Sequence, residues 1–385
     1  MNKKKLRVAI VGTGFIAKQH YEAIGRLAGT EIVAVVGRDE AKTRRFSQEY
    51  GIENYFTNFE ELFYMDIDVV HICTPNNLHY PMARLALENK INVFCEKPLS
   101  LTTEESGHLV ELAKESGVLH GVNLNYRSNA MVREMKKRVE EELGDLLLVK
   151  GEYIQDWLMF DDDYDWHFEP ELVGPSRTVA DIGSHLFDLI QFTTDRQIRR
   201  LYAKLITVYP TRYKRQQSGE TFAHTYSGEA EAVEVVNEDA AMIIAELDDG
   251  VKVSMHLSQV TGGFKNGLSL TISGSKESIT WKQEEPDKLF IGKRLGGNEL
   301  VYADPKYVDG SLARFAALPA GHAVGWADGM KNSIAEFYSH VRGEVDNSQS
   351  YVDFYKGHRL MQLVEACLIS NKEERWVELG ELNEE

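Results

Sequence analysis

The stretch "VADIGSHLFD", Val179 to Asp188, carries two carboxylates and an imidazole among apolar neighbours. Asp181, His185 and Asp188 are spaced four and then three residues apart, which places them on one face if the segment is helical. Such a stripe fits a metal site, a pair for proton transfer, or a hydrogen-bonded cluster in the core. No further His or Cys pattern accompanies it, so we predict no metal.

A second reactive group follows the apolar run Ile91 to Cys95 in "CEKPLS". If that run is a parallel strand, Glu96 and Lys97 lie at the edge of the sheet where ligands bind. A lysine there can hold a substrate oxygen and stabilise developing alkoxide charge. The unperturbed pKa of a histidine side chain lies near the working pH, so His185 can accept a hydroxyl proton. Taken alone, Lys97 fits a surface residue equally well.

The segment "VGTGFIA" has the spacing of a dinucleotide-binding turn. Gly12 allows the tight turn, Gly14 lets a pyrophosphate approach the backbone, and Ala17 permits close packing of helix on strand. The motif follows the first predicted strand and opens a helix, which is the context that it requires. The alternative is a tight turn without a ligand.

The end of the second predicted strand reads "VVGRDEAK". NAD-binding folds usually place a carboxylate there for the adenine ribose, but this chain has Gly37 and Arg38, with Asp39 one residue further. Arginine offers a bidentate partner to a 2′-phosphate, so we expect NAD(P) as cofactor with a slight preference for NADP. In the alternative, Arg38 stacks on the adenine and Asp39 contacts the ribose.

Hydrophobic periodicity divides the chain into two regions. Short apolar strands alternate with amphipathic helices up to about residue 125, which predicts a doubly wound parallel sheet. Longer alternating runs follow, including "AELDDGVKVS" with the Asp-Gly signal of a tight hairpin, and these predict an α+β domain with a largely antiparallel open sheet. We therefore expect an α/β fold with a Rossmann domain at 1–125 and a substrate-binding and oligomerisation domain at 126–385.

Composition narrows the class of protein. A chain of 385 residues exceeds the usual size of one compact unit, so two domains are expected. The formal charge of −17 argues against nucleic acid and anionic membranes as partners. The separated cysteines Cys73, Cys95 and Cys367 fit a reducing compartment, and no apolar run approaches a membrane span, so we expect a cytoplasmic protein.

Four segments, "VGTGFIAKQH", "TPNNLHY", "CEKPLS" and "ADIGSHLFDLIQF", resemble the Gfo/Idh/MocA family of oxidoreductases, and the similarity runs to the closing "RWVEL". The resemblance implies that Lys97 is the catalytic lysine, in a Lys-Pro peptide often found cis, with Asp181 and His185 as its partners. It also implies cofactor contacts along the loop after the third predicted strand and at Glu96. The expected cofactor-binding residues are Gly12, Gly14, Phe15, Ile16, Arg38, Thr74, Pro75, Asn76, His79, Glu96 and Asn125.

The segment leading into the histidine stripe, "YIQDWLMFDDDYDWHFEPELVGPSR", is rich in amides, carboxylates and aromatic rings. Its wording resembles family members acting on inositols or anhydrosugars such as levoglucosan. We expect substrate contacts from Gln155, Asp156, Trp166, His167, Arg177 and His322, while His322 fits a helix cap equally well. Trp157, His20 and His71 read as packing residues, and Lys265 and Asn266 as reaching a site or a dimer contact.

The expected function is NAD(P)-dependent transfer of hydride to or from a secondary hydroxyl of a cyclic polyol or sugar. Two other classes stay open: an NAD-dependent glycosidase that works by transient oxidation and elimination, and a non-catalytic protein that binds the cofactor as a sensor. The family resemblance further implies a homodimer or homotetramer assembled through the open sheet of the second domain.

Overall fold

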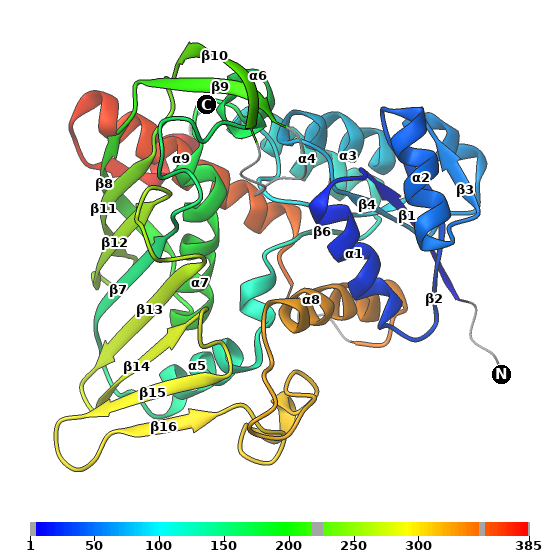
Figure 1. The fold of residues 1–385 in the computed structure, drawn as a ribbon. Helices are drawn as coiled ribbons and strands as arrows, with labels where there is room; N and C mark the ends of the chain where they lie inside the picture. Colours follow the sequence, from blue (N-terminus) through cyan, green and yellow to red (C-terminus); the bar gives the residue numbers. More distant parts are fainter. Residues whose placement is uncertain (1–4, 218–225, 346–350, 384–385) are drawn as a thin grey trace. The chain divides into compact units, whose positions relative to one another are not determined.

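The computed structural model describes residues 5–217, 226–345 and 351–383 (Figure 1). Contacts divide the chain into two compact units. The first comprises Met1–Leu124 with Met330–Met361, and the second comprises Asn125–Gly329 with Gln362–Glu385. The later boundaries fall inside two helices, α8 (Trp326–Val341) and α9 (Phe354–Glu373).

The first unit contains a six-stranded parallel sheet with the strand order β3-β2-β1-β4-β5-β6, which confirms the predicted Rossmann fold. Its central strands are buried on both faces, as their continuous apolar runs predict. The strands are β1 (Leu6–Val11), β2 (Thr30–Val36), β3 (Asn54–Phe56), β4 (Val69–Ile72), β5 (Asn92–Cys95) and β6 (His120–Val122).

Four helices connect these strands: α1 (Phe15–Gly25), α2 (Glu40–Tyr50), α3 (His79–Glu88) and α4 (Thr103–Ser116). Local sequence sets where α2 and α4 begin and end. The Asp39 and Thr102 side chains accept hydrogen bonds from the first turns of these helices, and Gly51 and Gly117 end them in the left-handed region, with φ of 66° and 70°.

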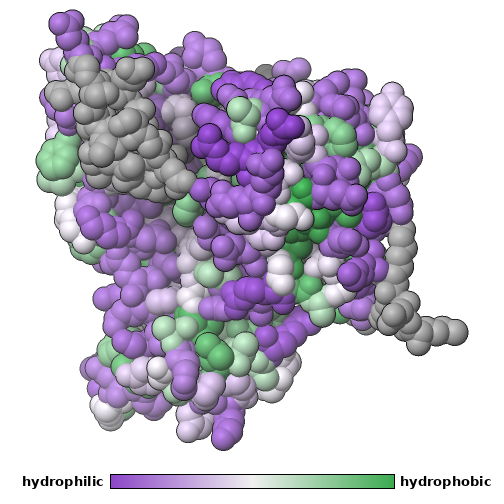
Figure 2. Space-filling view, turned by 45° about the vertical axis from the view of Figure 1, so that its right-hand side comes forward, coloured by the Kyte–Doolittle hydropathy of each residue, from purple (hydrophilic) through white to green (hydrophobic). Residues whose placement is uncertain are grey.

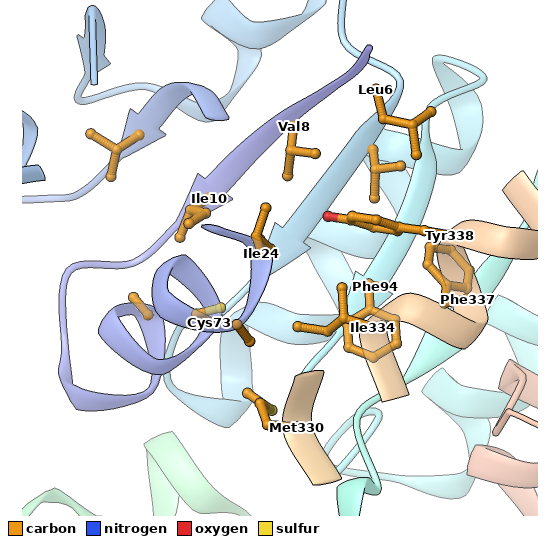
Figure 3. Close-up of a cluster of buried hydrophobic side chains, with 14 of the residues drawn as sticks. Leu6, Val8, Ile10, Ile24, Cys73, Phe94, Met330, Ile334, Phe337 and Tyr338 are labelled. Carbon is orange, nitrogen blue, oxygen red and sulfur yellow. The ribbon is translucent and has the colours of Figure 1, made fainter. Parts of the chain in front are cut away.

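The second half of α8 packs into the core of the Rossmann unit. Ile334, Phe337 and Tyr338 are buried together with strand and helix residues of the first 125 positions, as Figure 3 shows. The Phe337 and Phe94 rings lie 5.1 Å apart between centroids. The domain boundaries expected from the sequence, 1–125 and 126–385, do not include this return of the chain, because no local signal reports a contact across more than 200 residues.

The second unit is built on a nine-stranded mixed sheet with the order β16-β15-β14-β13-β7-β12-β11-β8-β17. Only the pair of β7 with β12 is parallel among the described pairs of this sheet, so the prediction of a largely antiparallel sheet is confirmed. The strands are β7 (Leu146–Ile154), β8 (Ile198–Ile206), β11 (Ala240–Leu247), β12 (Lys252–Ser258), β13 (Gly267–Gly274), β14 (Glu277–Lys282), β15 (Lys288–Lys293), β16 (Glu299–Tyr302) and β17 (Val377–Glu378).

Smaller elements complete the second unit. A separate two-stranded sheet pairs β9 (Thr211–Gln217) with β10 (Tyr226–Glu234), and the α-helices are α5 (Ala130–Glu141), α6 (Pro170–Val173) and α7 (Ser184–Thr194). A π-helical turn, Val179–Gly183, leads directly into α7. Short 3₁₀ turns occur at Phe59–Tyr64, Asn76–Leu78, Asn125–Ser128, Trp166–Phe168, Gly310–Leu312 and Leu379–Asn383.

Helices α5 and α7 cover one face of the large sheet (Figure 1). Helix α7 approaches β7 so closely that a Cβ at Gly151 would lie 2.6 Å from Leu186 Cδ1. On the face of the sheet away from α7, Met242 and Ile244 of β11 are more than half exposed. The side of the molecule drawn in Figure 2 is mostly hydrophilic. No helix among the described residues could span a membrane.

The packing of α8 gives a test of the first unit. Replacing Phe337 with alanine removes a fully buried ring, and we expect the free energy of unfolding of the full chain to fall by about 3–5 kcal/mol. Urea denaturation followed by circular dichroism measures this change. The control is Leu318→Ala, at a residue 42% exposed, with an expected loss below about 0.5 kcal/mol. Equal losses in the two variants would contradict the assignment of α8 to this core.

Candidate active site

The turn between β1 and α1 has the geometry of a pyrophosphate-binding loop. Gly12 has φ of 120°, and a Cβ there would lie 2.3 Å from the carbonyl oxygen of Cys73, so only glycine fits. Gly14 caps α1 without any side-chain hydrogen bond, and a Cβ on it would meet nothing within 4 Å. The first turn of α1 therefore presents backbone N–H groups to open space, which suits an anion. Phe15 is partly exposed and Ile16 half-buried in the same turn.

No carboxylate stands at the end of β2. Gly37 is buried against Thr43, whose Oγ1 would lie 2.4 Å from an added Cβ, so a side chain has no room there. Arg38 is exposed, and Asp39 accepts a hydrogen bond of 2.9 Å from the Lys42 N–H at the start of α2. The Asp39 carboxylate is thus engaged as a helix cap.

The loop after β4 contains buried polar atoms with no hydrogen-bond partner among the described residues. They are Thr74 Oγ1 and Asn77 Oδ1, and Asn123 Oδ1 beyond β6 is a third in this unit. Buried polar groups are normally paired, so these atoms fit a ligand that supplies the missing partners. Pro75 and Asn76, also expected to contact the cofactor, are half-buried in the same loop.

His79 connects this loop to the Lys97 turn. Its Nδ1 lies 2.6 Å from the carbonyl oxygen of Pro98, and its Nε2 lies 3.0 Å from that of Thr74. Burial lowers the pKa of His79, which disfavours the cation that could donate to both carbonyls at once. The side chain is fully enclosed, so the structure supports a bridging role, and its expected contact with the cofactor stays a prediction.

Lys97 begins a turn directly after β5, and the Lys97–Pro98 peptide is cis. The preceding Glu96 is buried; its Oε1 accepts hydrogen bonds of 2.7 Å from His20 Nε2 and 2.6 Å from Asn123 Nδ2, and its Oε2 lies 3.3 Å from the Lys97 backbone nitrogen. Burial by itself raises the pKa of Glu96, but His20, Asn123 and Lys97 together bring it below its ordinary value. The residue before the candidate lysine is therefore an ionised, fixed carboxylate.

In the second unit, Asp181 lies within the π-helical turn Val179–Gly183, and His185 follows it in the first turn of α7. Single π turns inside helices are rare and occur frequently at functional sites. Asp181 Oδ2 accepts a hydrogen bond of 2.8 Å from Gln259 Nε2. The Oε1 atom of the same Gln259 amide accepts hydrogen bonds from Arg177 Nη1 at 2.6 Å and Thr178 Oγ1 at 3.0 Å. These two donors fix which side of the Gln259 amide faces Asp181.

Arg177 is almost completely buried in this arrangement, with an exposed fraction of 1%. Its guanidinium also pairs with Asp239, which holds Arg212 as well, and stacks over the Phe168 ring with 4.3 Å between its Cζ and the ring centroid. Burial lowers the pKa of Arg177, and Asp239 opposes that shift. Its expected contact with substrate stays a prediction, and its packing supports a role in orienting Asp181 through Gln259.

His185 lies in a setting of tyrosines that the sequence reading missed. Its ring is 4.8 Å from that of Tyr126, and the Tyr126 hydroxyl lies 2.8 Å from the Tyr153 hydroxyl. Tyr153 donates a 2.6 Å hydrogen bond to Asn266 Oδ1, and burial raises the pKa of Tyr153 well above its ordinary range. In the sequence, the only signal for these tyrosines was the position of Tyr153 in a predicted strand, where alternation places its side chain on the inward face, two residues before Gln155.

Asp188, the third member of the stripe, is committed elsewhere. It forms a two-pronged ion pair with Arg127, with Nε to Oδ2 at 2.9 Å, and both side chains are buried. The described residues contain no group of three or more His, Cys, Asp or Glu side chains arranged to hold a metal. Asp188 is thus bound to Arg127, whereas Asp181 is bound to Gln259, and these different partners set Asp188 apart from Asp181 and His185.

The remaining substrate candidates in the described part of the second unit fall into small groups. The Asp156 carboxylate accepts 2.6 Å from Lys265 Nζ, and the bonds from Lys265 and Gly263 lower the pKa of Asp156 against the effect of burial. Gln155 binds the Trp157 indole N–H, with 3.1 Å between Oε1 and Nε1. The remaining three are Trp166, His167 and His322. The Trp166 and His167 rings are tilted against each other with 3.8 Å between their centroids. His322 is exposed, and its Nδ1 lies 3.2 Å from the carbonyl oxygen of Pro319. Asn125, a cofactor candidate, has a buried Nδ2 with no hydrogen-bond partner among the described residues.

Comparison with known proteins finds relatives over the whole chain. Levoglucosan dehydrogenase of Pseudarthrobacter phenanthrenivorans is 26% identical over 99% of this chain and 100% of its own length. Inositol 2-dehydrogenase of Corynebacterium glutamicum is 28% identical over 66% of this chain and 67% of its own. Among solved structures, levoglucosan dehydrogenase in its apo form matches with a TM-score of 0.89 and 25% identity over 98% of this chain and 99% of that one.

Two family models cover most of the sequence. The model described as an oxidoreductase family with an NAD-binding Rossmann fold matches residues 6–124, and the GFO/IDH/MocA C-terminal domain matches residues 132–280. The glycine turn and the lysine turn fall inside the first match, and Asp181, His185 and Gln259 inside the second. The chain therefore belongs to the Gfo/Idh/MocA family of oxidoreductases, with an NAD-binding Rossmann fold in its first unit.

Proposed function

We propose that the protein oxidises or reduces a secondary hydroxyl of a cyclic polyol or sugar, with a nicotinamide dinucleotide as the hydride partner. The observation that carries this proposal is the fixed Glu96–Lys97 turn at the carboxyl edge of a dinucleotide-binding sheet. The relatives named for levoglucosan and inositol favour a polyhydroxylated ring as the substrate class. We infer an anhydrosugar such as levoglucosan as the first substrate to examine.

The chemistry divides between named side chains. Oxidation of a secondary alcohol removes hydride from carbon and a proton from oxygen and leaves a ketone; the bound nicotinamide accepts the hydride. In this proposal, His185 accepts the hydroxyl proton, because imidazole titrates near neutral pH. Lys97 holds the oxygen and stabilises the charge that develops on it. Asp181, oriented by Gln259, binds the substrate or the imidazole.

The segments around Asp156 and Trp166 supply the proposed contacts to the other ring hydroxyls. Gln155 and Asp156 offer an amide and an ionised carboxylate, and the paired rings of Trp166 and His167 offer an apolar face to C–H groups. Arg177 and His322 complete the proposed set. In this proposal, Arg177 acts through its hydrogen bond to Gln259, whereas His322 is exposed on its loop.

Replacing either proposed catalytic side chain tests the function. We expect Lys97→Ala and His185→Ala each to lower kcat/KM for the best polyol or sugar substrate by more than about tenfold, a loss above ~1.4 kcal/mol of transition-state stabilisation. Steady-state kinetics with a panel of inositols, aldoses and anhydrosugars, followed at the absorbance of reduced nicotinamide, measures the change. His108→Ala, at an exposed imidazole on α4 to which no part in the site is assigned, is the matched control. Turnover within tenfold of wild type in either catalytic variant would overturn the assignment.

The cofactor preference follows from the end of β2. Because Gly37 offers no carboxylate and Asp39 caps α2, we propose that the exposed Arg38 can bind a 2′-phosphate, so that NADP is accepted at least as well as NAD. The expected result is a ratio of kcat/KM with NADP to that with NAD above one, which Arg38→Ala lowers by about tenfold. A strong NAD preference in the wild type would defeat this expectation.

The open face of the large sheet is the proposed surface for self-association into a homodimer or homotetramer. Met242 is 57% and Ile244 52% exposed on β11, and the edge strand β16, at the far end of the strand order, exposes Leu300 and Tyr302. Exposed apolar residues on an antiparallel sheet face commonly mark an interface. Light scattering at micromolar concentration should give twice or four times the chain mass of 43.7 kDa, and a monomer would contradict the proposal.

The buried free thiols, including Cys73 and Cys367, fit the proposed cytoplasmic location.

A further inference from the structure

A line of hydrogen-bonded side chains runs through the core of the first unit to Glu96. His20 on α1 and His71 on β4 are both completely buried. His20 Nε2 lies 2.7 Å from Glu96 Oε1, and His20 Nδ1 lies 2.7 Å from His71 Nδ1. The sequence predicts both histidines as packing residues, and they are indeed enclosed, but every ring nitrogen has a polar partner.

The line of hydrogen bonds ends at Tyr338 on α8. Its hydroxyl lies 2.8 Å from His71 Nε2, and the tyrosine is fully enclosed in the apolar cluster drawn in Figure 3. Burial raises the pKa of Tyr338 well above its ordinary range, so the phenol keeps its proton. Four side chains from three helix or strand elements and the lysine turn thus form one line: Tyr338, His71, His20 and Glu96.

The donors in this line point one way when both histidines are neutral. An ionised Glu96 only accepts, so His20 donates from Nε2 and its Nδ1 is left as an acceptor. His71 must then donate from Nδ1, and its Nε2 accepts the Tyr338 proton. Burial lowers the pKa of His71 well below its ordinary value, which keeps its ring neutral. Each hydrogen bond is consistent with the next only in this direction.

Other groups that face the two ends of the line do not replace it. Glu96 is also approached by Asn123, by Lys97, by His79 and by the thiols of Cys73 and Cys95, of which Asn123 and the Lys97 backbone are its hydrogen-bond donors. Arg342, which directly follows α8, and Cys73 face Tyr338. Asn123 Nδ2 also lies 3.0 Å from Met330 Sδ. His20 is held at its other ring nitrogen by His71, and through His71 by Tyr338, so it fixes the position of the carboxylate oxygen that it contacts.

We propose that His20, His71 and Tyr338 are positioning residues that hold the Glu96 carboxylate ionised and fixed beside Lys97. The inference rests on the proposed function, since it assigns the line of hydrogen bonds to the reaction of Lys97. It gives α8, with which the chain returns to this unit more than 200 residues after leaving it, a direct part in setting the charge next to the candidate catalytic lysine.

The kinetic test compares two replacements of His20. In His20→Phe, Glu96 loses a donor while staying buried, so its pKa rises and the acid limb of the pH profile of kcat/KM moves up by about one pH unit or more. In His20→Gln, the amide N–H can donate to Glu96 and the amide oxygen can accept from His71, so the acid limb stays within about 0.3 units of wild type. An unmoved limb in His20→Phe, or equal shifts in both variants, overturns the proposal.

A second measurement requires no turnover. Histidine ¹⁵N chemical shifts of the full chain, assigned with the His20→Gln and His71→Gln variants, report which ring nitrogen carries the proton. We expect the Nε2–H form of His20 and the Nδ1–H form of His71 at neutral pH; an Nε2–H form of His71 overturns the proposal even if His20→Phe fails to fold. The control, Tyr351→Phe, removes another buried phenol hydroxyl of this unit and should leave the histidine shifts unchanged. If wild-type protein oxidises no polyol or sugar, the proposed function fails, while these shifts still decide the direction of the line.

Discussion

The parallel pairing of β1, β4 and β5 is the constraint on which the candidate site of the first unit depends. Because the three strands run in the same direction with β4 in the middle, their carboxyl ends meet at one edge of the sheet. Gly12, Thr74 and Glu96 follow these ends, although more than 80 residues of sequence separate the first from the last. A Cβ added to Gly12 would collide with the Cys73 carbonyl, which shows how little space separates the two neighbouring loops. Cofactor turn and lysine turn are thus placed by backbone pairing, and side chains refine the result.

The second unit uses a different solution, in which buried charges orient a few polar groups. Asp239 binds both Arg177 and Arg212, and Arg177 in turn orients the Gln259 amide toward Asp181. A buried ion pair adds little net stability, because desolvation offsets the attraction between the charges. Its removal leaves an uncompensated charge, however, so such a cluster holds one geometry firmly. The cost is accepted where direction matters more than stability, as it does for a carboxylate that must face one way.

Local signals in the sequence were sufficient for most of the alternating strands and helices of the first 125 residues. The glycine turn follows from its short motif, and the cis Lys97–Pro98 peptide follows from the family resemblance. The partners of charged side chains did not follow, because they come from distant positions. His71 and Tyr338 are 267 residues apart, and Arg127 and Asp188 are 61 apart. A stripe of polar residues on a helix gives their common face but not which of them is already paired.

The π turn at Val179–Gly183 opens the helical segment that continues as α7. Each residue of an α-helix advances the chain by about 100° around the axis, and a π turn accommodates one residue more than an α turn. Asp181 lies inside this wider turn and His185 in the α-helical turn that follows, so the angle between their side chains differs from that of a regular i, i+4 pair. The four-residue spacing in the sequence gives the two residues a common helix face, whereas the wider turn sets the direction from which the carboxylate meets Gln259.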